Sequence, residues 1–490
     1  MSRLDSSGSG NSVSTRVLSS VVRRLLDARA APRLAERIGS WPQPALLESG
    51  QGFGIAGRHQ ILTAHPRLIF EANGPRWRIT TDQGSAQSGD GDPLAALGEL
   101  TRRYELAQSG SIPAPNEPPF QGGLIGYLGY DATPLIEPIP RRLPLETRLP
   151  DIRFGLYDTA VIVDGTRDTT ELWAWDLLGE GDQAVRRRAH RWQQALEHGP
   201  ARPIPRSRFL SPLTPLIDRS AYLRGVDRIL EYIAAGDVYQ VNLSRRFEAR
   251  GRVSPLDLYL RLKRQSPAPF AAFLAWDDLA LVSASPEWFY QTRGDRIVTR
   301  PIKGTRPRGP NTSDDLRLAA ELQASPKDRA ELTMIVDLER NDLGRVCDYG
   351  TIHVSEPATV ESFPQVHHLV ATVEGRLRES LGPIDVIQAM FPGGSITGAP
   401  KIRAMQIIDE LEPCRRGVYT GSIGYLSRGG SSAFNIAIRT IVVEGDRAHF
   451  HVGGGIVADS SPELEHLETL AKGRALRAVI DPDAGEWIDP

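Results

Sequence analysis

The sequence predicts an α+β protein, and two observations support that prediction. Segments with strand-like patterns come in groups, and these groups are mixed with helical segments without the regular alternation that marks a doubly wound parallel sheet. No internal repeat is apparent. The chain has 490 residues, of which 40% are hydrophobic and 24% charged. This composition is typical of a soluble globular protein, and the length allows roughly two to four domains.

The first half of the chain begins with a Ser/Gly-rich stretch, residues 1–15, which we expect to be a disordered tail. An amphipathic segment, 17–34, follows, and we expect a first helix that ends near Gly39. The Ser- and Arg-rich composition of this region is also that of an organelle transit peptide, although a frayed tail is the favoured interpretation. The other elements expected in this half are strands at 61–70, 77–81 and 122–130, helices at 94–109 and 183–198, and a hairpin formed by 154–164 and 171–178.

A proline-containing segment, 201–218, looks like a linker and divides the chain. We therefore expect an N-terminal domain over 16–205 and a second domain over 215–480. A last helix has Ser461 at its N-cap and Pro462 as its first residue. The other elements expected in the second domain are helices at 220–235, 255–265, 327–339, 384–391 and 400–412, and strands at 238–247, within 270–302, and at 421–426, 433–443 and 449–457.

Charge and cysteine content narrow the class of protein. The formal net charge is -2, which excludes a globally basic nucleic-acid binder and argues against polybasic attachment to a membrane. The two cysteines, Cys347 and Cys414, provide neither a disulfide framework nor metal-ligand spacing. That usage suits a reducing cytoplasm, and no apolar run approaches the length of a membrane span.

The stretch 300–308, with the sequence RPIKGTRPR, ends a predicted strand at a Lys-Gly turn signal. This would place Lys303 at the tip of a strand, with arginines close behind it. Lysine is the cationic side chain that can readily lose its proton and act as an amine nucleophile or base, and neighbouring cations lower its pKa. Taken alone, the stretch could also be a solvated basic hairpin.

Two predicted helices carry carboxylates in unusual places. Glu331 shares a face with the apolar residues of helix 327–339, where a carboxylate should not be buried without a partner. On the last helix Glu465, Glu468 and Lys472 share one face, which could equally be a surface ion pair between the last two. Because Mg²⁺ accepts carboxylates completed by water and substrate oxygens, Glu331, Glu465 and Glu468 could form a magnesium site.

Two glycine-rich stretches could bring backbone amides close to an anion. Residues 391–401, FPGGSITGAPK, form a turn into a helix, although Ala399 stands where a P-loop needs lysine. Residues 453–455 are consecutive glycines at the end of a predicted strand, and glycine lets the backbone approach a carboxylate closely. Either stretch taken alone could be a plain tight turn.

Taken together, these stretches resemble component I of the chorismate-utilising enzymes, which include anthranilate, aminodeoxychorismate, isochorismate and salicylate synthases. The resemblance is strong over 215–480 and weaker over 40–200. It implies a two-layer antiparallel β-sandwich with helices on the outside, in which the two halves of the chain interleave and the active site lies between the layers. The motifs that carry it are GDVYQVNL at 236–243, SPE at 285–287, the lysine stretch at 300–308, IVDLERNDL at 335–343, and the runs 391–412 and 453–472.

The resemblance also implies roles for individual residues. Glu331 and Glu468 resemble the direct Mg²⁺ ligands, with Glu465 close by. His368 and Ser395 resemble a pair near the reacting face of the ring. The groups implied to hold the ring carboxylate of chorismate are Tyr419, Arg439, Lys472 and the backbone amides of Gly453, Gly454 and Gly455.

Two positions divide the family by chemistry. Isochorismate and salicylate synthases carry a lysine where Gln240 stands, and because glutamine cannot take a proton from water, water addition is disfavoured here. Anthranilate synthases have alanine at the position of Lys303, whereas aminodeoxychorismate synthases have lysine. The implied mechanism has Lys303 attack C2 of chorismate and expel the 4-hydroxyl with help from Glu287 as general acid/base. Ammonia then attacks C4 and expels the lysine, which gives 4-amino-4-deoxychorismate, a precursor of p-aminobenzoate and folate.

The resemblance further implies a partner. Neither half of the chain shows the setting of a glutaminase cysteine nucleophile, so ammonia is expected from a separate glutamine amidotransferase subunit in a heterodimer.

Residues 46–49, LLES, are similar to the stretch that lines the tryptophan site of anthranilate synthases, which keeps anthranilate synthase open as an alternative activity. The sequence SPAPF at 266–270 departs from the Asn-Pro-x-Pro-Tyr of feedback-inhibited enzymes and argues against regulation by tryptophan.

An alternative from another class is a catalytically silent subunit that binds or regulates. The chain keeps all the candidate metal ligands and the candidate cation of the site, which argues against this alternative: Glu331, Glu465, Glu468 and Lys472.

Overall fold

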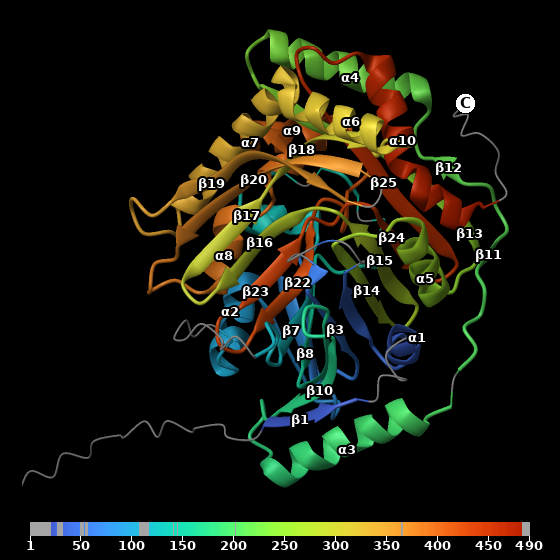
Figure 1. Ribbon diagram of the computed structural model, residues 1–490, viewed down its shortest axis with the longest axis vertical. Coiled ribbons are helices and arrows are strands. Elements are labelled where there is room, and N and C mark those ends of the chain that lie inside the picture. The colour runs from blue at the N-terminus through green and yellow to red at the C-terminus, as the bar shows by residue number, and fades with distance from the viewer. Residues whose placement is uncertain are drawn as a thin grey trace, which may run out of the picture.

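The computed structural model describes residues 21–26, 33–49, 53, 57–106, 117–140, 142–144, 146–200, 202–363 and 366–482 (Figure 1). The tail expected at 1–15 lies outside the described residues. Two large antiparallel sheets make up the body of the molecule, and helices lie on the outside (Figure 1).

The first sheet has 13 strands drawn from both halves of the chain. In chain order they are β1 (Val21–Leu25), β2 (Ala45–Glu48), β3 (His59–Thr63), β9 (Thr159–Asp164), β10 (Thr169–Trp175), β11 (Arg208–Phe209), β12 (Thr214–Pro215), β13 (Gln240–Arg252), β14 (Phe270–Trp276), β15 (Leu279–Ser285), β21 (Gly398–Ala399), β24 (Thr440–Glu444) and β25 (Arg447–Ile456). Their order in space is β1-β10-β9-β3-β2-β14-β15-β24-β25-β13-β11, and β12 and β21 also pair with β13. The two halves meet where β2 pairs with β14.

The second sheet has 12 strands and is mixed in the same way. Its strands are β4 (Leu68–Asn73), β5 (Arg76–Thr81), β6 (Ala86–Asp90), β7 (Gly123–Leu128), β8 (Ile152–Tyr157), β16 (Trp288–Arg293), β17 (Arg296–Arg300), β18 (Ile302–Pro307), β19 (His353–Ser362), β20 (Val366–Arg376), β22 (Ser422–Ser427) and β23 (Ser432–Asn435). Their order is β18-β20-β17-β16-β23-β22-β7-β8-β4-β5-β6, with β19 also paired to β20, and the halves meet where β7 pairs with β22.

The two sheets share one hydrophobic core. Leu124 and Phe154 of the second sheet are buried in the same cluster as Leu281 of the first. The rings of Tyr127, on β7, and Trp276, on β14, stack across the layers with centroids 6.0 Å apart. The predicted α+β sandwich with interleaved halves is therefore confirmed.

Ten α-helices are found within the described ranges, and they cover the outer faces and ends of the sheets. They are α1 (Leu34–Gly39), α2 (Pro93–Arg103), α3 (Asp182–His198), α4 (Arg219–Ala234), α5 (Pro255–Gln265), α6 (Thr312–Ala324), α7 (Pro326–Gly344), α8 (Pro383–Met390), α9 (Lys401–Leu411) and α10 (Pro462–Ile480). Ser461 is the N-cap of α10, as predicted. Helix α7 packs on β18 and β20, and α10 packs on β25, so these two helices stand over strands of different sheets.

Each of three predicted strands corresponds to two strands in the structure, one in each sheet. The segment 61–70 divides into β3 and β4, 154–164 into β8 and β9, and 433–443 into β23 and β24. The chain crosses from one sheet to the other between them. A crossing leaves the apolar pattern almost unbroken because the strands on both sides are buried, so the pattern alone predicts one long strand.

Two further differences concern helices. Residues 21–25 of the expected first helix form β1, whose side chains alternate between buried and exposed, and only Leu34–Gly39 is helical. Helix α6 was not predicted, although Asn311 is its N-cap and accepts a hydrogen bond from the backbone N–H of Asp314. The described part of the segment expected to be a linker contributes β11 and β12.

A buried ion pair joins the elements that surround the site. Glu412 and Arg416 are 4% and 3% exposed, and Arg416 Nη2 lies 2.7 Å from Glu412 Oε1. Arg416 also donates hydrogen bonds to the carbonyls of Asn242 and Ile396, at 2.8 and 3.2 Å. The guanidinium therefore ties β13 to the turn that carries Ser395.

We expect Glu412→Ala to lower the free energy of unfolding by about 3–5 kcal/mol, because it leaves a buried guanidinium without its counter-charge. Equilibrium unfolding in urea measures the loss. Glu321→Ala is the matched control, since Glu321 pairs with Arg317 on the exposed face of α6 and should cost less than about 1 kcal/mol. Equal losses in the two variants would contradict this account of the pair.

No helix in the described part of the chain is both long and apolar enough to cross a membrane.

Candidate active site between the sheets

Lys303 lies on β18, at a point where the strand pairing is irregular. Its partner on β20 is Leu369, and the register shifts between Lys303 and Thr305. Gly304 has a φ of +77°, a left-handed conformation that glycine adopts without strain. The irregularity turns the half-buried Lys303 towards the glycine-rich turn, where its Nζ donates a hydrogen bond to the backbone carbonyl of Ser395 at 3.2 Å.

Glu287 contacts the hydroxyl of the same residue, Ser395. The Ser395 hydroxyl donates a hydrogen bond to Glu287 Oε1 at 2.7 Å, and Glu287 is only 7% exposed. Burial raises the pKa of Glu287, although the Ser395 hydrogen bond and the charge of Lys303 act in the opposite direction. Burial likewise lowers the pKa of Lys303, against the charges of Glu287 and Glu331. Both shifts favour the neutral forms, a carboxylic acid beside a free amine.

Two of the predicted metal ligands meet over a glycine. A Cβ built on Gly454 would lie 3.0 Å from Glu465 Oε2 and 3.7 Å from Glu468 Oε1. Lys472 Nζ lies 2.7 Å from Glu468 Oε1 and donates to the carbonyl of Gly453 at 3.0 Å. The pKa of Glu468 is lowered: burial opposes this, but the charge and hydrogen bond of Lys472 outweigh it. Any side chain at position 454 would crowd this group of charges.

The third predicted ligand, Glu331, lies on α7 and is near enough to Glu468 of α10 for the two charges to interact. Burial raises its pKa, and the negative charge of Glu468 adds to the rise while the charge of Lys303 opposes it. Burial also raises the pKa of Glu465, against a hydrogen bond from Ser460. Within the described ranges no three acidic, histidine or cysteine side chains stand close enough together to enclose a metal ion. Carboxylate oxygens are ligands that Mg²⁺ accepts, and these three glutamates differ in setting: Glu465 is buried, Glu331 is half-buried, and Glu468 is exposed and paired with Lys472.

A cavity of about 400 Å³ opens beside this cluster. Three of the predicted residues, His368, Arg439 and Lys472, line it, together with Phe363 and Arg474. The Arg439 guanidinium is half-buried and makes no hydrogen bond or ion pair with any residue that the structure describes. An unpaired guanidinium that faces a cavity is a ready site for a carboxylate.

His368 is held on the wall of the cavity as a neutral ring. Its Nδ1 lies 2.9 Å from Thr305 Oγ1, two residues after Lys303. Burial and the charge of Arg439 lower the pKa of His368 to about 4. A neutral imidazole adds no charge next to the guanidinium of Arg439, so the guanidinium stays able to pair with an anion in the cavity.

The remaining predicted residues lie on or beside β25. The Tyr419 ring stacks on His451 with centroids 5.2 Å apart. Gln240 is fully buried, and neither its Nε2 nor its Oε1 has a hydrogen-bond partner among the described residues. A Cβ on Gly455 would lie 2.5 Å from Gln240 Nε2, and one on Gly453 would lie 2.4 Å from a backbone carbonyl of β13. The glycines thus allow the buried amide and the neighbouring strand to pack closely against β25.

The structure brings the predicted residues into two adjoining groups. The first group consists of Lys303, Glu287 and Ser395. The second consists of Glu465, Glu468 and Lys472. The cavity lined by Arg439 and His368 adjoins this second group. The sequence did not indicate three supporting residues: Thr305, which positions His368; Asn242, whose Nδ2 donates to the Ser395 carbonyl at 3.0 Å; and Arg416. Thr305 and Asn242 lie in motifs that carried the resemblance, so these motifs could have pointed to both residues.

Similarity to known proteins shows the family to which the chain belongs. A family model described as chorismate binding enzyme matches residues 59–478. The chain is 40% identical over 453 residues to aminodeoxychorismate synthase component 1 of Escherichia coli, covering 92% of this chain and 96% of that protein. It is 42% identical over 460 residues to anthranilate synthase component 1 of Thermus thermophilus, covering 92% and 95%. The crystal structure of anthranilate synthase component I from Streptococcus pneumoniae superposes with a TM-score of 0.75 at 32% identity, covering 87% of this chain and 95% of that one. The chain belongs to the family of chorismate binding enzymes.

Proposed function

We propose that the chain is component I of an aminodeoxychorismate synthase and that it transfers ammonia to C4 of chorismate through a covalent bond to Lys303. The observation that carries the proposal is the setting of this amine. Lys303 is half-buried, its pKa is lowered by burial, and its single hydrogen bond among the described residues goes to a carbonyl oxygen. It stands beside a carboxyl whose pKa is raised. Both shifts are in the direction of a free amine and a protonated acid, the pair that a substitution with a poor leaving group requires.

The first step uses both groups of this pair. The free amine of Lys303 attacks C2 of the ring, the double bonds shift, and the 4-hydroxyl leaves as water after it takes the proton of Glu287. In the second step ammonia attacks C4, the double bonds shift back, and the Lys303 amine leaves. Glu287, now ionised, accepts the proton that ammonia loses, which restores both residues. The balance is chorismate and ammonia in, aminodeoxychorismate and water out.

The cavity supplies the groups that would hold the substrate. Arg439 is the unpaired cation for a carboxylate, and the neutral ring of His368 lies on the same wall. The orphaned amide of Gln240 would gain a partner from a bound ring or from ordered water, since leaving it unsatisfied costs about 1–3 kcal/mol. Glu331, Glu465 and Glu468 would hold Mg²⁺, which when bound offsets the charge of the ring carboxylate. The ammonia would come from a separate glutamine amidotransferase.

We expect Arg439→Gln to raise KM for chorismate by about 10–100-fold, because charge-assisted hydrogen bonds contribute about 1.5–3 kcal/mol each. The value of kcat should change much less, since the guanidinium does not touch the reacting carbons in this mechanism. Arg474→Gln is the control: Arg474 lines the same cavity but is exposed. Steady-state kinetics on the three proteins separate these effects, and a fall in kcat at unchanged KM would contradict the assigned role.

Anthranilate synthase is the second candidate, and one structural feature favours it. Leu47 and Glu48, from the stretch similar to a tryptophan site, line a cavity of about 120 Å³ with Pro269 and Phe270. The relative in Thermus thermophilus carries that name. Incubation of the purified protein with chorismate, Mg²⁺ and ammonium, followed by identification of products by mass, distinguishes the two. Aminodeoxychorismate supports the proposal, anthranilate supports the alternative, and no consumption of chorismate would indicate a catalytically silent subunit.

A further inference from the structure

A second and larger hollow lies far from the chorismate cavity. It has a volume of about 940 Å³ and lies beside α3, at the opposite end of the molecule from α7 and α10 (Figure 1). One face of α3 forms its wall, through residues at helical spacing: Ala184, Arg187, Arg188, Arg191, Trp192 and Ala195. The alanines at the two ends of this row have short side chains, which leaves space at both ends of the wall. We call this hollow the α3 groove.

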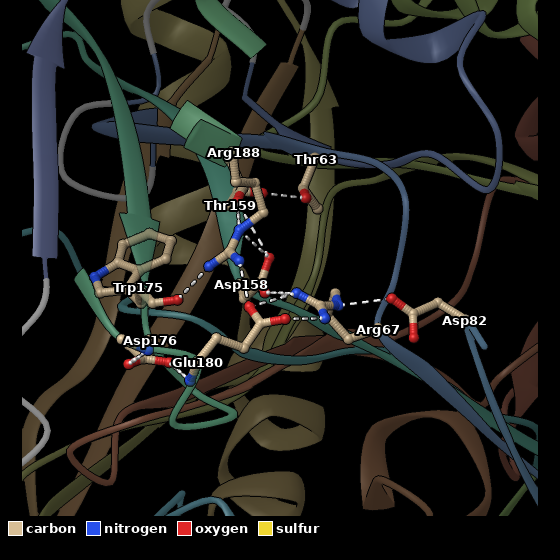
Figure 2. A network of polar contacts seen from close by, with 10 residues as sticks. Thr63, Arg67, Asp82, Asp158, Thr159, Trp175, Asp176, Glu180 and Arg188 are labelled. Atoms are coloured by element: carbon tan, nitrogen blue, oxygen red, sulfur yellow. Dashed lines mark hydrogen bonds and ion pairs between the residues drawn. The ribbon is translucent and has the colours of Figure 1, made fainter. Parts of the chain in front are cut away.

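Two arginines of the α3 groove are already paired with acidic groups. Arg67 Nη1 lies 2.9 Å from Asp158 Oδ2, and its Nη2 lies 2.7 Å from Glu180 Oε1. Arg188 contacts the same two carboxylates, at 3.1 and 2.7 Å (Figure 2). Asp82 completes the network through Arg67 Nε. Figure 2 shows these side chains converging on one another, and the floor of the groove holds three carboxylates against two guanidinium groups.

Three other arginines of the α3 groove lack this compensation. Arg187, Arg191 and Arg202 line the groove and are exposed. Arg187 donates to Gln183 Oε1 at 3.4 Å, and Arg191 and Arg202 have no hydrogen bond or ion pair in the part of the chain that the structure describes. Arg187 and Arg191 are four residues apart on one helix, where like charges repel. The whole chain has a net charge of -2, so this positive field is local and would attract an anion.

An aromatic shelf adjoins these arginines. Trp41 meets Trp192 edge-on with ring centroids 4.8 Å apart, and the exposed His65 ring lies 5.8 Å from Trp41. His65 and Gln43, both lining the groove, have φ values of 58° and 50°. A left-handed backbone is uncommon outside glycine and concentrates at functional positions. The shelf presents ring faces and edges on which a planar group can stack.

We propose that the α3 groove binds a nucleoside polyphosphate, with the base on Trp41 and His65 and the phosphates on Arg187, Arg191 and Arg202. Guanidinium groups match phosphate oxygens in bidentate geometry, which favours phosphates over a diffuse anionic surface. The volume is within the range of about 300–1,000 Å³ that is usual for small-molecule sites. An acidic peptide would use the arginines but would leave the aromatic shelf without a partner.

Isothermal titration of the full chain with ATP, without Mg²⁺, tests the proposal. We expect saturable binding with one site, weakened about tenfold or more in the double variant Arg187→Ala/Arg191→Ala. Arg186→Ala is the matched control, because Arg186 lies on the same helix, pairs with Asp182 and does not line the groove; its affinity should stay within threefold of the parent protein. Unchanged melting temperatures would show that the variants are folded.

The aromatic shelf is tested separately. Inorganic tripolyphosphate should bind at least about tenfold more weakly than ATP to the parent protein, and Trp41→Ala should remove most of that difference. Three results would overturn the proposal: no saturable binding of ATP, equal weakening by Arg186→Ala, or equal affinity for tripolyphosphate and ATP. The last would show a simple polyanion surface. None of these variants touches the residues assigned to chorismate.

Discussion

Replacing Lys303 with alanine is expected to lower the rate of aminodeoxychorismate formation by about a thousandfold or more, the scale of loss when a covalent nucleophile is removed. In the structure this amine is half-buried, held at 3.2 Å from the Ser395 carbonyl, and close to Glu287, the acid proposed to assist departure of the hydroxyl. Among the described lysines, only Lys303 donates a hydrogen bond to Ser395, the residue that hydrogen-bonds to Glu287. Residual product from the variant should shift towards anthranilate, because ammonia then attacks C2 directly.

Lys303→Arg is the matched control for this prediction. Arginine keeps the positive charge but does not lose its proton near neutral pH, so it cannot attack carbon. A role in electrostatic binding would be rescued by arginine, whereas a nucleophilic role would not. Product analysis with saturating ammonium measures both variants, and unchanged output of aminodeoxychorismate from either one would refute the covalent role.

The second large effect concerns Glu287. We expect Glu287→Gln to reduce kcat by about 10²–10⁴-fold, the usual contribution of a general acid or base. Glutamine keeps the shape and can still accept the hydrogen bond from Ser395, so the loss isolates proton transfer. Ser395→Ala is the control: it removes that hydrogen bond but leaves the acid in place, and its loss of rate should be smaller.

The pH dependence follows from the two opposite shifts. The rate should rise with pH as Lys303 loses its proton, and burial moves this rise below the usual range for lysine. The rate should also depend on the protonated fraction of Glu287, which falls as pH rises; burial raises the pKa of Glu287, so this fraction stays larger than for an exposed glutamate. In Glu287→Gln the fall at high pH should disappear while the rise remains. The measurement is kcat against pH at constant concentration of free ammonia, and a persistent fall in the variant would contradict the assignment.

The sequence allowed the fold class, the helices that carry the acidic residues and the candidate groups themselves to be predicted. Helix α10 begins at Pro462, as expected from Ser461, and the shared face of Glu465, Glu468 and Lys472 follows from helical spacing. The crossings between sheets at 64–67 and 436–439 were not predictable, because buried strands on both sides of a crossing share one apolar pattern. Arg439 lies in the second crossing, with a φ of 50°, so its orientation towards the cavity depends on a backbone turn that the pattern does not reveal.

The contacts that define the chemistry are long-range and could not be read from spacing. Glu287 and Ser395 are 108 residues apart, and Lys303 is 92 residues from the carbonyl that it contacts. Each pair is set by the packing of one sheet against a turn that follows α8. The resemblance identifies Lys303 and Glu287 from the sequence. Their burial, which sets the direction of both pKa shifts, is seen only in the folded structure.

The most direct test of the account is the mass of the protein itself, quenched in acid shortly after mixing with chorismate and Mg²⁺ in the absence of ammonia. We expect a covalent species heavier than the chain by chorismate less one water, located by peptide mapping at Lys303 and absent from Lys303→Arg. Formation of aminodeoxychorismate on addition of ammonium, with Lys303 unmodified at every earlier time, would contradict it.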